Sequence, residues 1–207
     1  MRDLLVNKKI IIYGTGSFYD MCCNLWQDSE DEYLNFDSNK VDLANIFEGY
    51  SPAEYHVFVA IDNALLGLSR SSMLTKFMEK GYRIANLISK DATIGDRCKI
   101  GMNCFVGPGV TIRSDAVIPL NTIILKDSTI GQKVKIGMSG WIGSRSYIGD
   151  RVTIGKNVTI LNNVVIEDDT KIGNYCIFEK PETYSGEIAE NTFHLSVCKE
   201  PVKIYSF

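Results

Sequence analysis

Aliphatic residues recur at every sixth position through the second half of this sequence. Reading in steps of six from residue 94 to residue 178 meets fifteen apolar side chains without a frame slip; fourteen are Ile or Val and the last is Phe178. A period of six fits neither an α-helix nor an alternating β-strand. It is typical of a hexapeptide parallel β-helix, in which each hexapeptide supplies one short strand and one corner.

Two other positions of the hexapeptide support this interpretation. A small or β-branched residue stands two places before each periodic residue and is expected to face the core, and Cys98, Cys104 and Cys176 share that register. A glycine often follows the periodic residue, as at Gly95, and is expected to adopt a turn conformation that side chains resist. Three hexapeptides make one triangular coil, so residues 92–181 predict five coils, stacked at the strand spacing of ~4.8 Å.

Residues 1–88 show a different pattern. A strand over 9–13 is followed at once by Gly14-Thr15-Gly16-Ser17-Phe18 and then by a predicted helix over 20–26. A glycine-rich turn between a strand and a helix is a place where phosphates bind, although a tight turn explains the same residues. Further strands are predicted over 33–36, 56–61 and 82–88, with a helix over 65–80.

This order of elements predicts a small Rossmann-like α/β sheet, whose ligands bind at the carboxyl ends of the strands. Asp37 follows Gly16 by 21 residues, near the spacing at which an acidic residue meets a ribose hydroxyl. We therefore expect a Rossmann-like domain over 1–88, a β-helix over 89–181 and a capping tail over 182–207. The candidate substrate-binding residues are Gly14, Gly16, Ser17, Phe18, Asp37 and Asp62.

Composition narrows the classes of function. The chain has 207 residues, 45% of them hydrophobic, and a net charge of −3, which predicts a globular protein without an electrostatic footprint for nucleic acid. No apolar run reaches the ~20 residues that a membrane span needs. The charged start argues against a signal peptide, so we expect a cytoplasmic protein. The six cysteines form no C-x-x-C pair, so we expect neither a metal site nor disulfides.

The combination of a small Rossmann-like domain and a hexapeptide β-helix is specific. With the segments Ile-Ile-Tyr-Gly-Thr-Gly at 11–16, Val-Ala-Ile-Asp-Asn at 59–63 and Leu-Ile-Ser-Lys-Asp-Ala-Thr-Ile-Gly at 87–95, the chain resembles bacterial sugar acyltransferases of the sialic-acid O-acetyltransferase and bacillosamine N-acetyltransferase type. The resemblance covers residues 8–178. It implies a left-handed β-helix, a homotrimer, a nucleotide-sugar bound by the N-terminal domain, and acetyl-CoA held between neighbouring helices as the acyl donor.

The segment that carries the family's catalytic histidine departs from the pattern at that residue. The family's Asn-Thr-Gly-Ala-Ile-Val-x-His-Asp-x-x-Ile-Gly is matched at 121–131 by Asn121, Thr122, Asp127 and Gly131. Lys126 stands where the histidine is expected, and a second family histidine falls on Lys135. The two histidines of the chain, His56 in a predicted buried strand and His194 in the tail, do not obviously replace it.

The missing histidine leaves the catalytic base open. Acetyl transfer needs a group that takes a proton from the attacking amine or hydroxyl. A lysine, with a reference pKa of ~10.4, is charged unless it is desolvated or lies near other cations. The candidate catalytic residues are Lys126 and Asp127; alternatively, Lys126 binds a phosphate or carboxylate, or is a solvated corner residue.

The resemblance also implies a cofactor-binding position. Gly143, one coil beyond Leu125, matches the glycine whose backbone N–H meets the thioester oxygen, which makes Gly143 and Ser144 the candidates; Gly143 is also explained as a repeat glycine. Three hypotheses remain. The first is an acetyl-CoA-dependent acyltransferase acting on an activated amino sugar in bacterial surface-glycan biosynthesis. The second is a sugar-nucleotide-binding scaffold that lacks the base, and the third is a structural or assembly protein.

Overall fold

The computed structural model describes residues 9–26 and 32–204. They form two compact units, which divide between Asn86 and Leu87, two residues before the boundary expected from the sequence. Each unit is described by itself.

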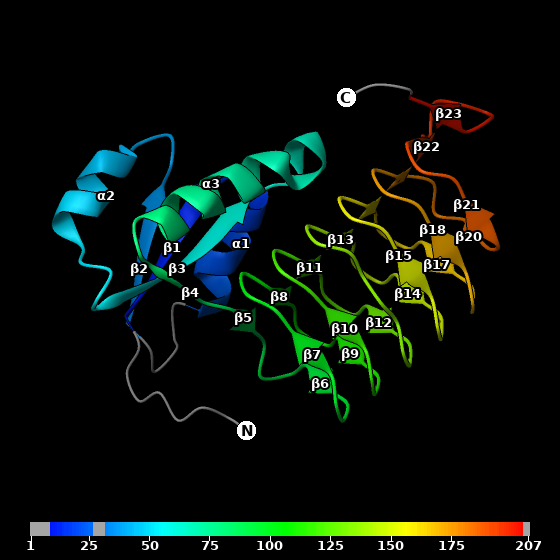
Figure 1. The fold of residues 1–207 in the computed structure, drawn as a ribbon, viewed down its shortest axis with the longest axis horizontal. Helices are drawn as coiled ribbons and strands as arrows, with labels where there is room; N and C mark the ends of the chain where they lie inside the picture. Colours follow the sequence, from blue (N-terminus) through cyan, green and yellow to red (C-terminus); the bar gives the residue numbers. More distant parts are fainter. Residues whose placement is uncertain (1–8, 27–31, 205–207) are drawn as a thin grey trace. The chain divides into compact units, whose positions relative to one another are not determined.

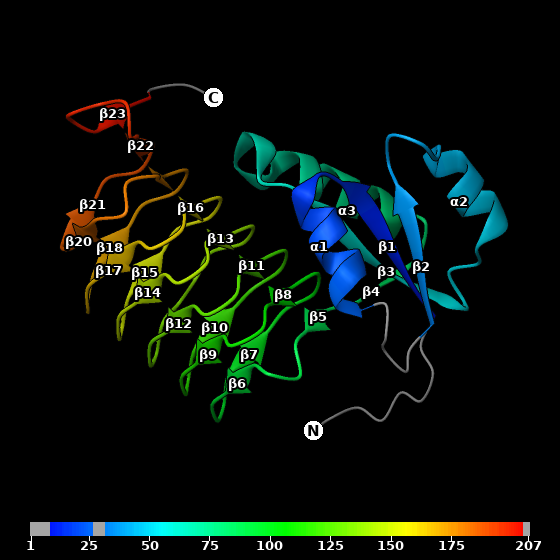
Figure 2. The same ribbon diagram turned by 180° about the vertical axis from the view of Figure 1, so that it is seen from behind.

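Unit 1 is a parallel four-stranded sheet with the strand order β2-β1-β3-β4. Figures 1 and 2 show helices α1 and α3 on opposite faces of this sheet. Because both faces are covered, the central strands are apolar along their whole length, and Ile11 and Ile12 are fully buried. The elements are β1 (Lys9–Thr15), α1 (Ser17–Trp26), β2 (Glu32–Asp37), α2 (Leu43–Gly49), β3 (Tyr55–Ile61), η1 (Ala64–Gly67), α3 (Leu68–Glu79) and β4 (Arg83–Ile84).

Unit 2 is a left-handed parallel β-helix, seen in Figure 1 as a stack of coils. Face 1 contains β5 (Leu87–Ile88), β8 (Phe105–Val106), β11 (Ile123–Ile124), β13 (Trp141–Ile142), β16 (Thr159–Ile160), β19 (Ile177–Phe178) and β22 (Thr192–His194). Face 2 contains β6 (Thr93–Ile94), β9 (Thr111–Ile112), β12 (Thr129–Ile130), β14 (Tyr147–Ile148), β17 (Val165–Ile166) and β20 (Thr183–Tyr184). Face 3 contains β7 (Lys99–Ile100), β10 (Val117–Ile118), β15 (Thr153–Ile154), β18 (Lys171–Ile172) and β21 (Glu187–Ile188).

The periodic aliphatic residues form the core of this helix, as the sequence predicts. Ile124 pairs with Ile142 in the next coil, and Ile142 with Ile160, and all three side chains are fully buried. Equivalent side chains therefore stack one above another along the axis. The predicted fold class, a Rossmann-like α/β domain followed by a left-handed β-helix, is confirmed.

The glycines after the periodic residues have a different role from the predicted one. The left-handed conformation occurs two residues later, as at Arg97 (φ 57°), Asn103 (φ 52°) and Asp127 (φ 60°), and not at Gly95. A Cβ atom on Gly95 would instead lie 2.7 Å from the backbone nitrogen of Ser114 in the next coil. The prediction of a special turn conformation at these glycines is therefore wrong; they permit close approach of successive coils.

The strand expected over 82–88 is two strands in two different sheets. Ala85 N donates to Val57 O within unit 1 (2.8 Å), whereas Leu87 N donates to Cys104 O within the β-helix (3.0 Å). The hexapeptide register extends back from residue 94 to Ile88, which explains why the β-helix begins there.

The coils also continue beyond residue 181, where a capping tail was expected. Strands β20, β21 and β22 stack in parallel on β17, β18 and β19. Lys171 pairs with Glu187, sixteen residues later, so this last coil is two residues shorter than the others. Strand β23 (Val202–Lys203) then pairs antiparallel with β22 at the end of face 1. The tail therefore adds a further coil before this last strand.

Candidate functional site

The predicted catalytic and cofactor-binding residues share one corner of the β-helix, which we call the 1–2 corner because it joins face 1 to face 2. Lys126 and Asp127 follow β11, and Gly143 and Ser144 follow β13 one coil later. Arg145 N donates to Lys126 O at 3.0 Å, which joins the two coils directly at this corner.

Lys126 and Asp127 both present exposed side chains at the 1–2 corner. Within the described part of the chain, neither side chain takes part in an ion pair. The backbone holds Asp127 in place, because Asp127 N donates to Pro108 O at 2.9 Å. The exposed Lys126 ammonium group is open to an anionic group of a ligand. The Asp127 carboxylate is an acceptor open to a ligand.

The backbone at Gly143 is not arranged as the resemblance implies. Gly143 N donates to Ile160 O at 2.7 Å, and Ser144 N donates to Asn162 Oδ1 at 2.8 Å. Both N–H groups are therefore occupied by the next coil. This geometry does not support the predicted role of Gly143 as the N–H donor to a thioester oxygen. Gly143 and Ser144 do share the 1–2 corner with Lys126, one coil later.

The other predicted base positions lie elsewhere. Lys135 is exposed on face 3, where it bridges Val117 and Thr153, and so does not share the 1–2 corner. His56 lies in β3 of unit 1. His194 lies in β22 of the last coil, stacked on the ring of Phe178 at 4.9 Å.

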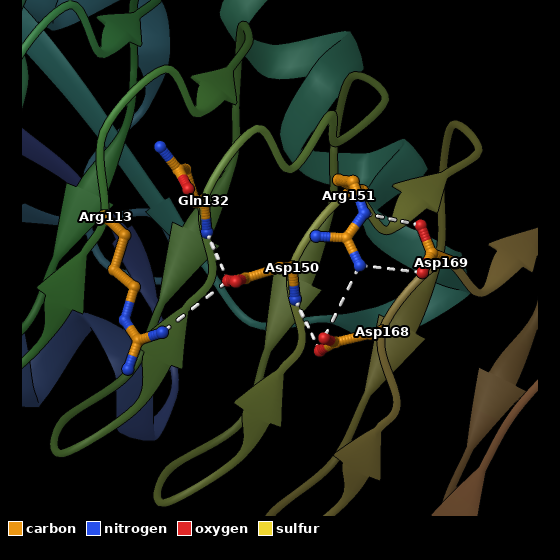
Figure 3. Close-up of polar contacts among 6 residues, drawn as sticks. All are labelled: Arg113, Gln132, Asp150, Arg151, Asp168 and Asp169. Carbon is orange, nitrogen blue, oxygen red and sulfur yellow. Dashed lines mark hydrogen bonds and ion pairs between the residues drawn. The ribbon is translucent and has the colours of Figure 1, made fainter.

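A groove of about 350 Å³ lies where face 2 meets face 3, at a different corner from Lys126. Its lining includes Arg113, Gln132 and Asp150, and no predicted site residue. Figure 3 shows Arg113 reaching across the coils to Asp150, with Nη1 and Oδ1 3.6 Å apart, while Gln132 N donates to the same carboxylate at 2.7 Å. The charged groups of this groove therefore satisfy one another.

In unit 1, the loops after β1 and β2 meet at the carboxyl edge of the sheet. Gly14 pairs with Asp37 across β1 and β2, and Ser38 N donates to Gly14 O at 2.7 Å. The side chains are also joined, because Asn39 Nδ2 donates to Thr15 Oγ1 at 2.6 Å. The structure thus brings Asp37 next to the glycine-rich turn, as the candidate substrate site requires.

The carboxylate of Asp62, from the loop after β3, occupies the N-terminus of α1. Phe18 N donates to Oδ1 at 2.8 Å and Ser17 N donates to Oδ2 at 3.1 Å. Gly16 has a φ of 85°, and a Cβ atom on it would collide with this carboxylate. A Cβ atom on Gly14 would collide with Ala60 O. The two glycines thus serve the packing of the chain itself, and a carboxylate fills the place expected for a phosphate.

Asp37 is fixed by its own turn. Asn39 N donates to Oδ1 at 2.9 Å, and Lys40 Nζ lies 3.4 Å from Oδ2. The backbone N–H of Asn39, aided by Lys40, lowers the pKa of the Asp37 carboxyl below its ordinary value. Asp37 is therefore a carboxylate at neutral pH, able to accept hydrogen bonds from a ligand hydroxyl.

Sequence reasoning missed Thr15, Asn39 and Arg70 at this edge. Arg70 of α3 is fully buried, and its Nη1 donates to Ile61 O at 3.1 Å, directly before Asp62. The run Asp37-Ser38-Asn39 after a strand is typical of a turn closed by an aspartate side chain, which could have indicated Asn39. An arginine in a helix pattern gives no sign that it is buried.

Comparisons with known proteins agree with this architecture. A family model of the bacterial transferase hexapeptide (six repeats) matches residues 151–180, and a model of the hexapeptide repeat of succinyl-transferase matches residues 92–126. This chain carries the bacterial transferase hexapeptide repeat. The predicted resemblance to hexapeptide-repeat transferases is thereby confirmed. The comparison with curated proteins finds no match.

Solved structures match this hexapeptide-repeat chain over both of its units. Perosamine N-acetyltransferase from Caulobacter crescentus, as a histidine-to-asparagine mutant in complex with CoA and GDP-perosamine, is 16% identical with a TM-score of 0.67, covering 95% of this chain and 97% of that one. The acetyltransferase domain of PglB from Neisseria gonorrhoeae, in complex with acetyl coenzyme A, is 16% identical with a TM-score of 0.58 and coverages of 90% and 95%. WeeI from Acinetobacter baumannii is 17% identical with a TM-score of 0.57 and coverages of 90% and 96%. At these identities the likeness establishes a common fold.

Neither a membrane span nor a metal cluster is found in the parts of the chain that the structure describes. Helices long and apolar enough to cross a bilayer do not occur among residues 9–26 and 32–204. Within the same residues, there is no group of three or more His, Cys, Asp or Glu side chains that could hold a metal ion.

Proposed function

We propose that this chain is an acyl-CoA-dependent acyltransferase, which transfers an acetyl group from acetyl-CoA to an amino sugar carried on a nucleotide or otherwise activated. The observation that carries this proposal is the match to perosamine N-acetyltransferase over 95% of this chain, in a structure that holds both CoA and GDP-perosamine. The reaction belongs in the cytoplasm, at a step of bacterial surface-glycan biosynthesis.

The chemistry requires an acceptor for one proton. The amine nitrogen of the sugar attacks the carbonyl carbon of the thioester, a C–N bond forms, the C–S bond breaks, and CoA leaves as its thiol. The nitrogen loses a proton on the way. Of the two candidates at the 1–2 corner, we assign proton transfer to Asp127 and binding of an anionic group of the substrate or of CoA to Lys126.

The nucleotide part of the acceptor is placed in unit 1, at the edge formed by the loops after β1 and β2. Asp37 and Thr15 offer acceptors for the hydroxyl groups of a ribose or sugar. Because the Asp62 carboxylate already caps α1, the phosphates are expected to lie away from Ser17 and Phe18. A homotrimer, with acyl-CoA between neighbouring β-helices, completes the proposed assembly.

A second candidate function is a scaffold that binds a sugar nucleotide without transferring an acyl group. Two points favour it: Lys126 stands where the resemblance places the histidine base, and the N–H groups of Gly143 and Ser144 are occupied by the next coil. This scaffold would need neither acyl-CoA nor Lys126.

Calorimetric titration separates the two functions. The full chain is titrated with acetyl-CoA, with GDP-perosamine and with a UDP-linked amino sugar as probes. An acyltransferase binds acetyl-CoA as well as one of the nucleotide sugars, and Lys126→Ala weakens acetyl-CoA or sugar binding. A chain that binds a nucleotide sugar, but shows no heat with millimolar acetyl-CoA, is a scaffold.

A further inference from the structure

Polar residues at the left-handed corner position form ladders from one coil to the next. At this position, a side-chain donor in one coil repeatedly holds the oxygen of the residue eighteen places later. Arg97 binds Asp115 with two hydrogen bonds, at 2.7 and 2.9 Å. Arg151 binds Asp169 in the same way, at 2.6 and 2.7 Å, as Figure 3 shows.

Neutral amide acceptors are held in the same way as the carboxylates. Asn103 Nδ2 donates to Asn121 Oδ1 at 2.8 Å, and Arg145 Nε donates to Asn163 Oδ1 at 2.9 Å. Corner oxygens are thus paired by the preceding coil at all three corners of the helix, whether the acceptor is a carboxylate or an amide.

Asp127 departs from this pattern because the residue eighteen places before it is Gly109. Gly109 has a φ of 68°, so it holds the same left-handed conformation as the residues of the ladders, yet it has no side chain to donate. A Cβ atom there would collide with Asp127 Oδ1, so the carboxylate of Asp127 occupies the space above Gly109. The next residue along the ladder, Arg145, donates to Asn163, eighteen places later, as Arg97 does to Asp115.

We infer that Gly109 is a positioning residue, which leaves the carboxylate of Asp127 without a side-chain partner among the described residues, so that it can take the proton of the attacking amine. This inference rests on the proposed function. The amine nitrogen bonds to the acetyl carbon, its proton passes to Asp127, and CoA leaves. The proton then goes on to the departing sulfur, so that amine and acetyl-CoA give amide and CoA thiol, and Asp127 is restored as a carboxylate.

A glycine is the residue that achieves this at position 109. Any other side chain would meet the Asp127 carboxylate, and a donor would bind it as Arg97 binds Asp115. An ion pair stabilises the carboxylate without the proton and restrains its geometry, and both effects oppose proton transfer. The exposed Lys126 does not supply such a pair, since no ion pair within the described residues joins it to Asp127.

The test introduces the missing ladder partner. Gly109→Arg reproduces the Arg97–Asp115 pair, and Gly109→Asn reproduces the Asn103–Asn121 pair with a residue that adopts the left-handed conformation elsewhere in this chain. Steady-state acetyl transfer is measured with acetyl-CoA and whichever of GDP-perosamine and a UDP-linked amino sugar the wild type acetylates. Arg97→Asn, which alters the partner of a ladder carboxylate outside the 1–2 corner, is the control for changes to a ladder as such.

Both Gly109 variants are expected to lower kcat by roughly tenfold or more, since general base catalysis contributes about 10²–10⁴-fold, while KM for acetyl-CoA changes by less than about threefold. In the Asp127→Asn background, Gly109→Arg is expected to have less than about a twofold further effect, because it acts through Asp127. Arg97→Asn keeps the wild-type kcat.

Two failures are distinguishable. If the wild type transfers no acetyl group, the proposed function is contradicted and this role of Asp127 falls with it. If the wild type is active, and Gly109→Arg and Gly109→Asn fold and retain its kcat, the inference alone is overturned. An equal loss of kcat in the Asp127→Asn background would also overturn it, because Gly109 would then act by another route.

Discussion

At the scale of single residues, the cysteines show what the sequence could and could not predict. Their register predicts small side chains facing the core, and Cys104 and Cys176 are indeed buried. Their contacts were not predictable: Cys104 Sγ donates to Pro119 O at 3.0 Å, as Ser128 Oγ at the equivalent register position donates to Gly143 O at 2.8 Å. A period shows which way a side chain points, whereas its partner depends on where the next coil lies.

Asp62 illustrates the same limit at the candidate site. The sequence places it correctly at the carboxyl end of a strand, but only the fold shows that it caps α1 through Ser17 and Phe18. Asp62→Ala is expected to lower the free energy of unfolding of unit 1 by about 1 kcal/mol, the usual effect of losing a helix cap.

The freed N–H groups give this prediction a second measurement. Inorganic phosphate is expected to shift the amide NMR signals of Ser17 and Phe18 in Asp62→Ala, but not in the wild type, because an anion then takes the place of the carboxylate. Equal shifts in both proteins would show that Asp62 does not exclude phosphate from this turn.

At the scale of elements, the hexapeptide period predicted the coils, but it gave the wrong reason for their glycines. A Cβ atom on Gly137 would collide with the backbone of Gly155 and Lys156. Gly81, at the end of α3, has a φ of 85° and open space around it. A substitution at Gly137 therefore tests the close approach of the coils, whereas a substitution at Gly81 tests the left-handed backbone conformation alone.

Gly137→Ala is expected to destabilise the chain by about 1–3 kcal/mol, as overpacking does, and Gly81→Ala by about 1 kcal/mol through its left-handed φ. Denaturant unfolding of both variants measures the difference. If Gly81→Ala is clearly the more damaging, close approach of the coils does not explain the repeat glycines.

The last coil contains a histidine whose charge is opposed by its surroundings. His194 stacks on Phe178 and makes an edge contact with Tyr184 at 4.8 Å, and its Nε2 is buried without a hydrogen-bond partner in the described residues. Burial, followed by the charge of Lys180, lowers the pKa of His194 below 6.5, against an opposing effect of Glu182. The folded chain therefore holds this imidazole neutral.

Stability should fall as the pH drops below about 6.5, because the unfolded chain then binds a proton that the folded chain resists. Melting temperatures are measured from about pH 7.5 to about pH 5.5 for the wild type and for His194→Phe, which keeps an aromatic ring in the stack. The melting temperature of the variant is expected to fall by less than that of the wild type over this range. An identical loss in both proteins would assign the pH dependence to other groups.

At the scale of the whole molecule, the sequence predicted the fold class of both units, because the six-residue register and the strand-turn-helix pattern are local signals. It did not predict the site in full. The space above Gly109, the cap formed by Asp62 and the occupied N–H of Gly143 all depend on residues that lie far apart in the sequence and meet only in the folded chain.

Acetyl transfer by the full chain tests the proposed function most directly. The protein is incubated with labelled acetyl-CoA and GDP-perosamine or a UDP-linked amino sugar, and the products are separated and analysed by mass spectrometry. The proposed function predicts an N-acetylated nucleotide sugar and free CoA in equal amounts, with formation strongly reduced in Asp127→Asn. The absence of acetylated product from a folded wild type that binds the nucleotide sugar would contradict it.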